Sequence, residues 1–284
     1  GNMTFFYLAI LFWILAWGLN IWLSSLSSFG FAKTLSPILF GASIIILWES
    51  SVHAFNISFV ILPAPSQVFI KFFYSLDILW VDFVQTFLKG ALSGFFIGCS
   101  SAILIALLVD RFNFLERGLL PIGNLLSAMP IIGTAPILVA WFGFDWHSKA
   151  AVVVAMVFFP MLINTVQGIK LSDRLYQDLM NTYSSSYFQT LIKLRLPAAM
   201  PFIFNGLKIC STLSLIGAIV AEFFGSPIKG MGFRISTEAG RFALDMVWAE
   251  IFVAAITGTL FYGVIALLEK IITHWHPSQR GRVN

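Results

Sequence analysis

The sequence predicts an all-α integral membrane protein, and composition is the first reason. Of its 284 residues 58% are hydrophobic and only 11% are charged, with 30 Phe and 9 Trp. A water-soluble domain carries roughly a quarter charged residues. The apolar residues also gather into long runs, and about 20 such residues suffice for a helix to cross a bilayer. Mean hydropathy is correspondingly high, at +0.89.

Six of these runs are long enough to span a membrane, and a seventh is shorter. The six are Thr4–Leu23, Thr86–Val109, Leu119–Phe142, Ala150–Ile169, Phe202–Phe224 and Val247–Ile272. The shorter one, Leu35–Trp48, becomes a full span if its helix continues past Glu49 and His53 to Phe55. We therefore expect seven spans, with residues 1–34 forming an extra amino-terminal helix and linker beside a six-helix core at 35–284.

A proline-containing stretch separates the second and third spans. Leu62-Pro63-Ala64-Pro65 disfavours helix before each proline. Apolar residues then recur at helical spacing, which predicts a helix lying on the outer membrane surface. They are Val68, Phe69, Phe72, Phe73, Leu76 and Leu79. A plain loop with a partly buried helix and no separate role is the alternative.

Residues 171–201 form the longest polar interruption between two apolar segments in the second half. Leu175 and Leu179 lie one turn apart, which predicts a short amphipathic helix. Ser184–Ser186 are expected to break the chain and to cap a second short helix. We expect Leu196-Pro197 to end that helix and to begin the next span. The segment is thus at least an amphipathic cytoplasmic connector.

Several function classes lack the residues that they require. The sequence has no Gly-rich phosphate-binding loop ending in Gly-Lys-Ser/Thr, so it carries no nucleotide site of that kind. We also expect no metal site and no other cofactor in this chain. Cys99 and Cys210 lie in apolar runs without metal-ligand spacing. The sequence has no basic patch of the kind that binds nucleic acid. It also lacks the nucleophile and base inside facing spans that an intramembrane enzyme requires. An ion-coupled secondary transporter stays open as an alternative.

Basic residues indicate the orientation of the chain. With the 171–201 segment in the cytoplasm and the spans alternating, ten Lys and Arg face the cytoplasm and six face outward. Cytoplasmic loops are enriched in Lys and Arg, so this placement is favoured. The amino terminus is then expected outside and the carboxyl terminus in the cytoplasm.

The 171–201 segment resembles a cytoplasmic motif of the membrane subunits of bacterial ABC importers. That motif is Glu-Ala-Ala, three residues, Gly, nine residues, Ile, one residue and Leu-Pro. In this sequence its positions hold Asp178, Leu179, Met180, Ser184, Leu194, Leu196 and Pro197, of which the last two match outright. The resemblance implies that these residues, with Tyr183 as a further apolar anchor, dock on an ATPase subunit.

Further stretches resemble the membrane subunit of importers of the nitrate, sulfonate, taurine and pyrimidine-precursor group. They are Trp48-Glu49, Leu62-Pro63-Ala64-Pro65-Ser66, residues 130–149, Phe158-Phe159-Pro160, Ala221-Glu222 and Gly230-Met231-Gly232. The resemblance implies a type I importer permease of the bacterial inner membrane that pairs as a homodimer. It also implies two cytoplasmic ATPase subunits, which bind ATP and Mg²⁺, and a soluble or lipid-anchored substrate-binding protein. The carboxyl end, residues 275–281, looks most like members that transport thiamine-pyrimidine or riboflavin precursors.

The residues of the translocation path are less sharply indicated. Met129-Pro130 and Thr134 interrupt one span, which predicts a cavity lining, although a purely structural kink explains them equally well. Asn164 and Glu222 are polar groups within spans and need partners. For Glu222 a substrate or gate contact competes with an ion pair to Arg234, Arg241 or Lys229.

Overall fold

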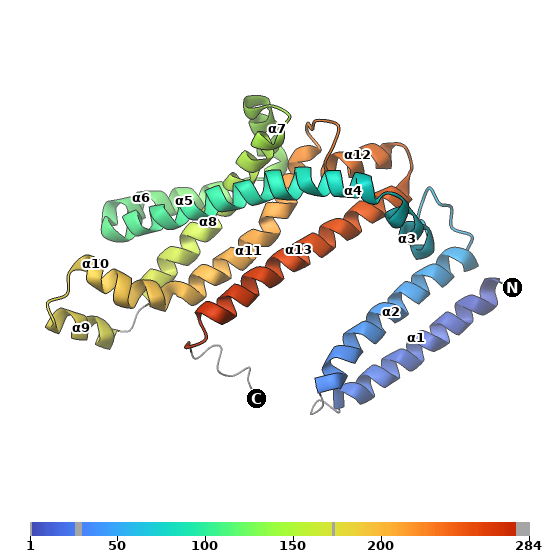
Figure 1. Cartoon of the computed structure of the whole chain (residues 1–284), viewed down its shortest axis with the longest axis horizontal. Helices are drawn as coiled ribbons and strands as arrows, with labels where there is room; N and C mark the ends of the chain where they lie inside the picture. The colour runs from blue at the N-terminus through green and yellow to red at the C-terminus, as the bar shows by residue number, and fades with distance from the viewer. Residues whose placement is uncertain (1, 26–29, 172–173, 277–284) are drawn as a thin grey trace. The chain divides into compact units, whose positions relative to one another are not determined.

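The computed structural model describes residues 2–25, 30–171 and 174–276, and it confirms the all-α fold. Its helices are α1 (Asn2–Ser25), α2 (Gly30–Ala54), α3 (Pro65–Tyr74), α4 (Leu76–Phe83), η1 (Val84–Ala91), α5 (Leu92–Arg111), α6 (Asn113–Ser127), α7 (Ile131–Phe142), α8 (Trp146–Lys170), α9 (Arg174–Thr182), α10 (Tyr187–Thr190), η2 (Leu191–Arg195), α11 (Leu196–Glu222), α12 (Met231–Gly240) and α13 (Leu244–Ile272) (Figure 1). Among the described residues, six continuous helices are long and apolar enough to cross a membrane, or seven if a bent pair counts as one span. The chain divides into two compact units, Gly1–Ile78 with Ile235–Ile251, and Leu79–Arg234 with Phe252–Asn284.

In the first unit α1 and α2 lie side by side (Figure 1). The helix α2 runs without a break past Glu49 and His53 to Ala54, which confirms the longer form of the second span. A hydrogen bond of 3.0 Å from the Ser36 hydroxyl to the Asn20 side-chain oxygen joins the two helices. Few polar contacts are needed here, because most side chains of both helices are apolar and exposed, as expected of helices that face lipid.

The proline-containing stretch leads into a short helix, as the sequence predicts. Pro65 occupies the first turn of α3, where its missing N–H costs nothing. The expected apolar face is divided, however, because α3 ends at Tyr74 and Ser75 caps it by donating to the Phe72 carbonyl. Leu76 and Leu79 belong instead to α4, the start of a continuous helix that ends at Arg111. A position of α3 on the membrane surface stays a prediction.

Three helices of the second unit, α5, α8 and α11, form its core. The order of their contacts shows that α5 runs parallel to α8 and α11 runs antiparallel to it. Small residues permit the close approach: a Cβ at Gly94 would lie 2.5 Å from Val153 Cβ, and one at Gly98 would lie 2.5 Å from Val157 Cγ2. Such contacts are the usual means of helix association where water supplies no hydrophobic driving force.

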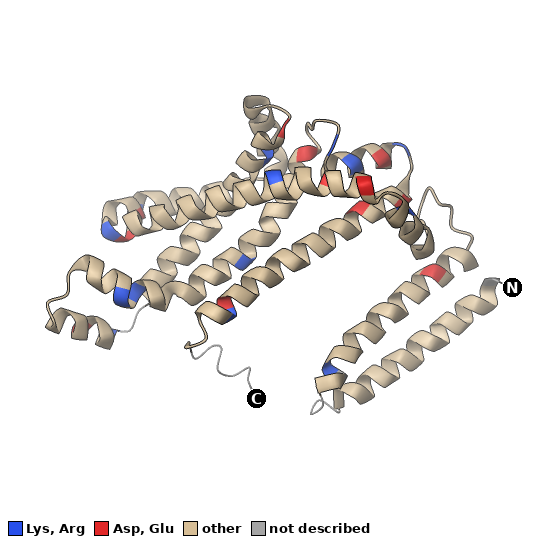
Figure 2. Ribbon diagram, in the orientation of Figure 1, with Lys and Arg blue, Asp and Glu red and all other residues tan. Residues whose placement is uncertain are grey.

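The interior of this unit is apolar, and charges are sparse along its long helices (Figure 2). Phe261 of α13 packs edge-on against Phe87 and Phe95, with ring centroids 5.3 and 4.8 Å apart. Cys99 and Cys210 are buried free thiols in the same core. Lys208 forms an ion pair of 2.8 Å with Glu269 and is not merely extended toward the surface.

The predicted span Leu119–Phe142 is divided between two helices. These are α6 and α7, which are bent by 101° across the break between Ser127 and Ile131. Pro130 is the N-cap of α7 in an extended conformation, which the helix interior does not allow. The predicted interruption at Met129-Pro130 is thus present, and it is much sharper than a kink.

The expectation that Leu196-Pro197 ends a helix is wrong. Residues 187–222 form one continuous helix, in which the π-helical turn η2 leads directly into α11. The Leu196 amide donates to the Leu191 carbonyl, five residues earlier. A wider turn just before Pro197 relieves the crowding that a proline ring causes in a regular helix. Residues 187–195 of the polar segment are therefore continuous with α11.

We predict that Gly94→Ala lowers the stability of the folded protein by about 1–3 kcal/mol, the usual cost of overpacking. The added Cβ would lie 2.5 Å from Val153 Cβ and 2.7 Å from the Ala150 carbonyl oxygen. Gly18→Ala in α1 is the matched control, because no heavy atom lies within 4 Å of its added Cβ. Thermal unfolding of the detergent-solubilised variants measures both effects, and equal midpoints would contradict the close packing of α5 on α8.

Candidate functional site

The segment before α11 presents an exposed apolar surface, formed by α9 and the turn that follows it. None of the nine residues of α9 is buried. Leu175, Leu179 and Tyr183 are 71%, 51% and 77% exposed, while Met180 is partly buried and Asp178 is exposed. Figure 1 shows α9 and α10 at the end of the α8–α11 pair. An exposed apolar row on a polar loop is typical of a protein docking surface.

The backbone conformation of Ser184 accounts for the glycine that the motif has at this position. Its φ is 55°, in the left-handed region that glycine adopts without strain. The Ser185 amide donates to the Met180 carbonyl at 3.0 Å, and the Ser184 amide donates to the Asn181 carbonyl at 2.9 Å. This pattern is a Schellman motif, which ends α9. Ser186 then caps α10 by accepting a hydrogen bond from the Gln189 amide, which confirms the predicted cap.

A second polar feature joins this segment to the core helices. The Asp110 carboxylate, at the end of α5, accepts two hydrogen bonds from the Arg195 guanidinium, one of them 2.9 Å long, and one of 2.5 Å from the Tyr187 hydroxyl. Arg195 Nε also donates to the Ile169 carbonyl at 3.3 Å, near the end of α8. We call Asp110, Tyr187 and Arg195 the Asp110 cluster. Only 5% of the Asp110 side chain is exposed.

At the other end of the same helices the Glu222 carboxylate is 3% exposed and is satisfied by hydrogen bonds. It accepts hydrogen bonds from the Thr86 hydroxyl at 2.6 Å, the Gly232 amide at 3.0 Å and the Phe233 amide at 3.4 Å. The Thr86 oxygen in turn accepts one from the Met231 amide at 2.7 Å. These bonds, rather than the expected ion pair, satisfy Glu222.

Asp82 completes this network. Its carboxylate accepts a hydrogen bond from the Gly230 amide at 2.8 Å and another from Arg234 Nε at 3.0 Å. Four consecutive amides at the start of α12, residues 230–233, therefore all donate to side chains of α4, η1 and α11. Gly230 has φ 123°, and a Cβ there would lie 2.1 Å from Glu222 Oε2. Gly230 is thus required by close approach to the carboxylate, and a Cβ at Gly232 would lie 2.2 Å from the Ile219 carbonyl oxygen.

The first turn of α8 is fixed beside this network. Asp145 caps the helix by accepting a hydrogen bond of 2.7 Å from the Trp146 amide, and Gln85 donates to the same carboxylate at 3.1 Å. These bonds, the amide first, hold the pKa of Asp145 below its ordinary value, so the carboxylate stays charged at neutral pH. Lys149 is buried one turn later and donates to the Phe144 carbonyl at 2.5 Å.

A cavity of about 700 Å³ lies between the broken α6–α7 pair and α8. Aromatic and thioether side chains contribute to its lining, together with the Ser127 and Thr134 hydroxyls. The lining residues are Leu126, Ser127, Met129, Ile131, Thr134, Ile137, Leu138, Trp141, Val154, Ala155, Met156, Phe158, Phe159, Pro160 and Leu213. None of these lining residues is charged. Its size is within the range of small-molecule sites.

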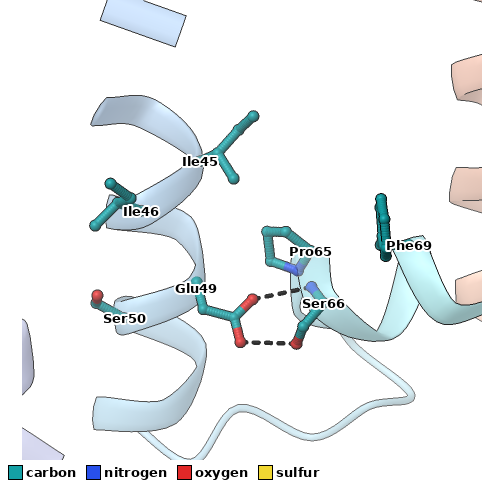
Figure 3. A pocket seen from close by; sticks show the side chains of 7 residues that line it. All are labelled: Ile45, Ile46, Glu49, Ser50, Pro65, Ser66 and Phe69. Carbon is teal, nitrogen blue, oxygen red and sulfur yellow. Dashed lines mark hydrogen bonds between the residues drawn. The ribbon is translucent and has the colours of Figure 1, made fainter. Parts of the chain in front are cut away.

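A smaller pocket of about 350 Å³ lies in the first unit, where Glu49 meets the Pro65–Ser66 stretch (Figure 3). The Glu49 carboxylate points at the first turn of α3, where it accepts hydrogen bonds from the Ser66 amide at 3.0 Å and the Ser66 hydroxyl at 2.8 Å. A carboxylate is favoured at a helix amino terminus. Trp48 packs on Trp248 with ring centroids 5.1 Å apart.

Comparison with known proteins identifies the family. Residues 94–274 match the family of binding-protein-dependent transport system inner membrane components. The chain belongs to this family. It is a permease subunit of an ABC importer and a multi-pass inner-membrane protein. Similar proteins include the formylaminopyrimidine transport permease protein of Halalkalibacterium halodurans, 31% identical over 251 residues that cover 87% of this chain and 98% of that protein.

Two further relatives carry other names. The riboflavin transport system permease protein of Chloroflexus aurantiacus is 28% identical over 83% of this chain and 88% of its own length. The putative aliphatic sulfonates transport permease protein of Bacillus subtilis is 28% identical over 86% of this chain and 88% of its own length. Of these three relatives, two are therefore named for aromatic heterocycles and one for an anion.

Some of the residues predicted for the translocation path line the cavity, and others lie outside its lining. Met129 and Thr134 line the cavity, and Pro130 is the N-cap of α7. Asn164 lies elsewhere: it donates to the Pro160 carbonyl at 2.8 Å and accepts from Asn205 at 3.2 Å. Glu222 belongs to the network at the start of α12. The docking and path roles of all these residues stay predictions.

Sequence reasoning missed the partners of the buried acids. Asp82 and Asp110 belong to no recognisable motif, and the available signal is that each is an acidic residue bordering or within a long apolar run. Sequence reasoning also missed the small residues Gly90, Gly94 and Gly98, whose four-residue spacing is the signal for close helix packing.

We predict that Thr86→Val destabilises the permease by about 1–3 kcal/mol, because the Met231 amide loses its acceptor and Glu222 loses a donor. Thr165→Val is the matched control. Thr165 is equally buried, but its hydroxyl only donates to the Met161 carbonyl within its own helix. Thermal unfolding in detergent compares the two, and an equally small shift in both would contradict the network.

Proposed function

We propose that this permease forms the path by which a small, uncharged aromatic solute enters the cell, with a thiamine-pyrimidine or riboflavin precursor as the cargo class. The observation that carries the proposal is the cavity beside α8, whose aromatic and hydroxyl lining includes Trp141, Phe158 and Thr134 but no charged residue. An anion brought there would lose hydration without gaining a charged partner, which is costly. A flat heterocycle can stack on aromatic rings and bond to hydroxyls.

The relatives named above support this cargo class, since two of them are named for formylaminopyrimidine and riboflavin. A sulfonate is the alternative, because a third relative is named for aliphatic sulfonates. In importers of this kind a binding protein selects the cargo first. We propose that a soluble or lipid-anchored binding protein delivers it to the outer side of a permease homodimer.

Two ATPase subunits are proposed to dock on the cytoplasmic segment 171–201 and to bind the ATP and Mg²⁺. Support comes from the apolar row Leu175, Leu179 and Tyr183, each of which is more than half exposed. Asp178 lies exposed on the same helix, and Leu194, Leu196 and Pro197 follow at the junction with α11. Apolar anchors at the centre of an interface contribute most of its affinity. In this placement the amino terminus lies outside and the carboxyl terminus in the cytoplasm.

We predict that Leu179→Arg combined with Tyr183→Arg leaves the permease folded but abolishes ATPase docking. Each exposed apolar anchor is replaced by a charge that the partner's groove would have to desolvate, at a cost of about 2 kcal/mol or more per anchor. Co-purification of the ATPase, and ATP hydrolysis stimulated by the binding protein in nanodiscs, measure the effect.

Ile228→Arg is the matched control for this substitution. Ile228 is 81% exposed and apolar, but it lies in the loop after α11, at the opposite end of that helix from the docking segment. We expect it to retain the ATPase. Failure of the unmodified permease to bind any ATPase would refute the docking proposal.

We further predict that proteoliposomes holding the complete importer accumulate a formylaminopyrimidine at least ten times faster than taurine. The two solutes are compared at equal concentrations, with ATP on the side of the membrane that corresponds to the cytoplasm. An uncharged lining penalises the sulfonate, and a 1.4 kcal/mol difference in barrier already gives a factor of ten. Uptake of labelled solutes is the measurement. Faster uptake of taurine would overturn the cargo class and leave the permease role intact.

A further inference from the structure

The Asp110 cluster fixes the proposed docking segment to the rest of the core. Tyr187 and Arg195 belong to α10 and η2, directly after α9, whereas Asp110 is the penultimate residue of α5. Arg195 also reaches the Ile169 carbonyl in the last turn of α8. Three helices that are far apart in sequence, α5, α8 and α11, thus meet at one guanidinium group.

The geometry of this contact resists both sliding and rotation. Two guanidinium nitrogens bind the two carboxylate oxygens of Asp110, and such paired bonds fix orientation as well as distance. Tyr187 Oη adds a third donor, and the Arg111 guanidinium carbon lies 4.9 Å from the Tyr187 ring centroid. Because 5% of Asp110 and 17% of Arg195 are exposed, separating them would leave poorly hydrated charges.

The contact also leads toward the cavity. Only Phe112 separates the end of α5 from the start of α6, and α6 is the first half of the broken pair that lines the cavity. In the other direction, α10 and η2 continue without a break into α11. A displacement of the docking segment therefore has two routes into the core: along α11, and through Asp110 to α5 and α6.

We propose that Asp110, Tyr187 and Arg195 are positioning residues for transport, which carry the movement of the docked ATPase to α5 and thereby to the broken α6–α7 pair. This inference rests on the docking proposed above. With the cluster intact, closure of the ATPases on the docking segment moves α11 and α5 as one body and repositions α6. Without it the end of α5 is no longer held to η2, so a displacement of α11 repositions α6 less and ATP is hydrolysed with little transport.

The test measures solute moved per ATP hydrolysed in proteoliposomes holding the complete importer. For Asp110→Asn we expect the ATPase to co-purify as with the unmodified permease, hydrolysis to continue, and the transport-to-hydrolysis ratio to fall at least tenfold. Tyr187→Phe, which keeps the ion pair, should lower the ratio less. Asp110→Glu, which keeps the charge, should restore part of it.

A second variant separates coupling from folding. Asp110→Asn with Arg195→Gln removes both charges, so neither is left buried and unpaired, and its thermal midpoint should exceed that of Asp110→Asn alone. We expect its transport-to-hydrolysis ratio to stay low. Recovery of the ratio together with the thermal midpoint would show that the cluster only supports folding, and would overturn the proposal.

Glu116→Gln is the matched control. Glu116 pairs with Lys170 and so joins α6 to α8 without a bond to the docking segment, and both side chains are more exposed than those of Asp110 and Arg195. Its ratio should stay within twofold of the unmodified value. A tenfold fall here too, or an unchanged ratio in Asp110→Asn, would overturn the proposal. Failure of the unmodified permease to bind the ATPase would instead refute the proposed docking, on which this inference rests.

Discussion

The second unit depends on satisfying a few buried polar groups in a core that offers them no water. Asp110 and Glu222 close the two ends of the α5–α8–α11 core, and both carboxylates are almost fully enclosed. Each is held by several donors from other helices, which is the condition under which a buried charge is tolerated. Between these ends the helices meet through glycines and small apolar side chains. The helix arrangement is therefore specified at its ends and close-packed along its length.

Much of the fold follows from sequence because the bilayer limits the choices. A run of about 20 apolar residues can only be a helix when it spans a membrane, so the spans and the second helix past Glu49 could be predicted. The break at Pro130 was visible for the same reason, since proline removes a helix hydrogen bond. The 101° bend was not visible, because the angle is set by how α6 and α7 pack afterward.

The partners of the polar residues could not be predicted, because they lie far away in the chain. Asp110 and Arg195 are 85 positions apart, and Thr86 and Glu222 are 136 apart. Local pattern reasoning sees an acidic residue at the edge of an apolar run but not which helix end it meets. Pro197 led to a wrong prediction, because proline usually ends a helix. Here a π-helical turn before it lets the helix continue.

These features together indicate which part of the second unit can move. A Cβ added at Gly94 or Gly98 would collide with Val153 or Val157, so α5 is close-packed against α8 at these positions. The broken α6–α7 pair is different, because it meets α8 across a cavity of about 700 Å³ and its two halves join at an extended residue, Pro130. A rigid core clamped at both ends beside one hinged pair is suited to convert a displacement at the end of α11 into a change of cavity shape.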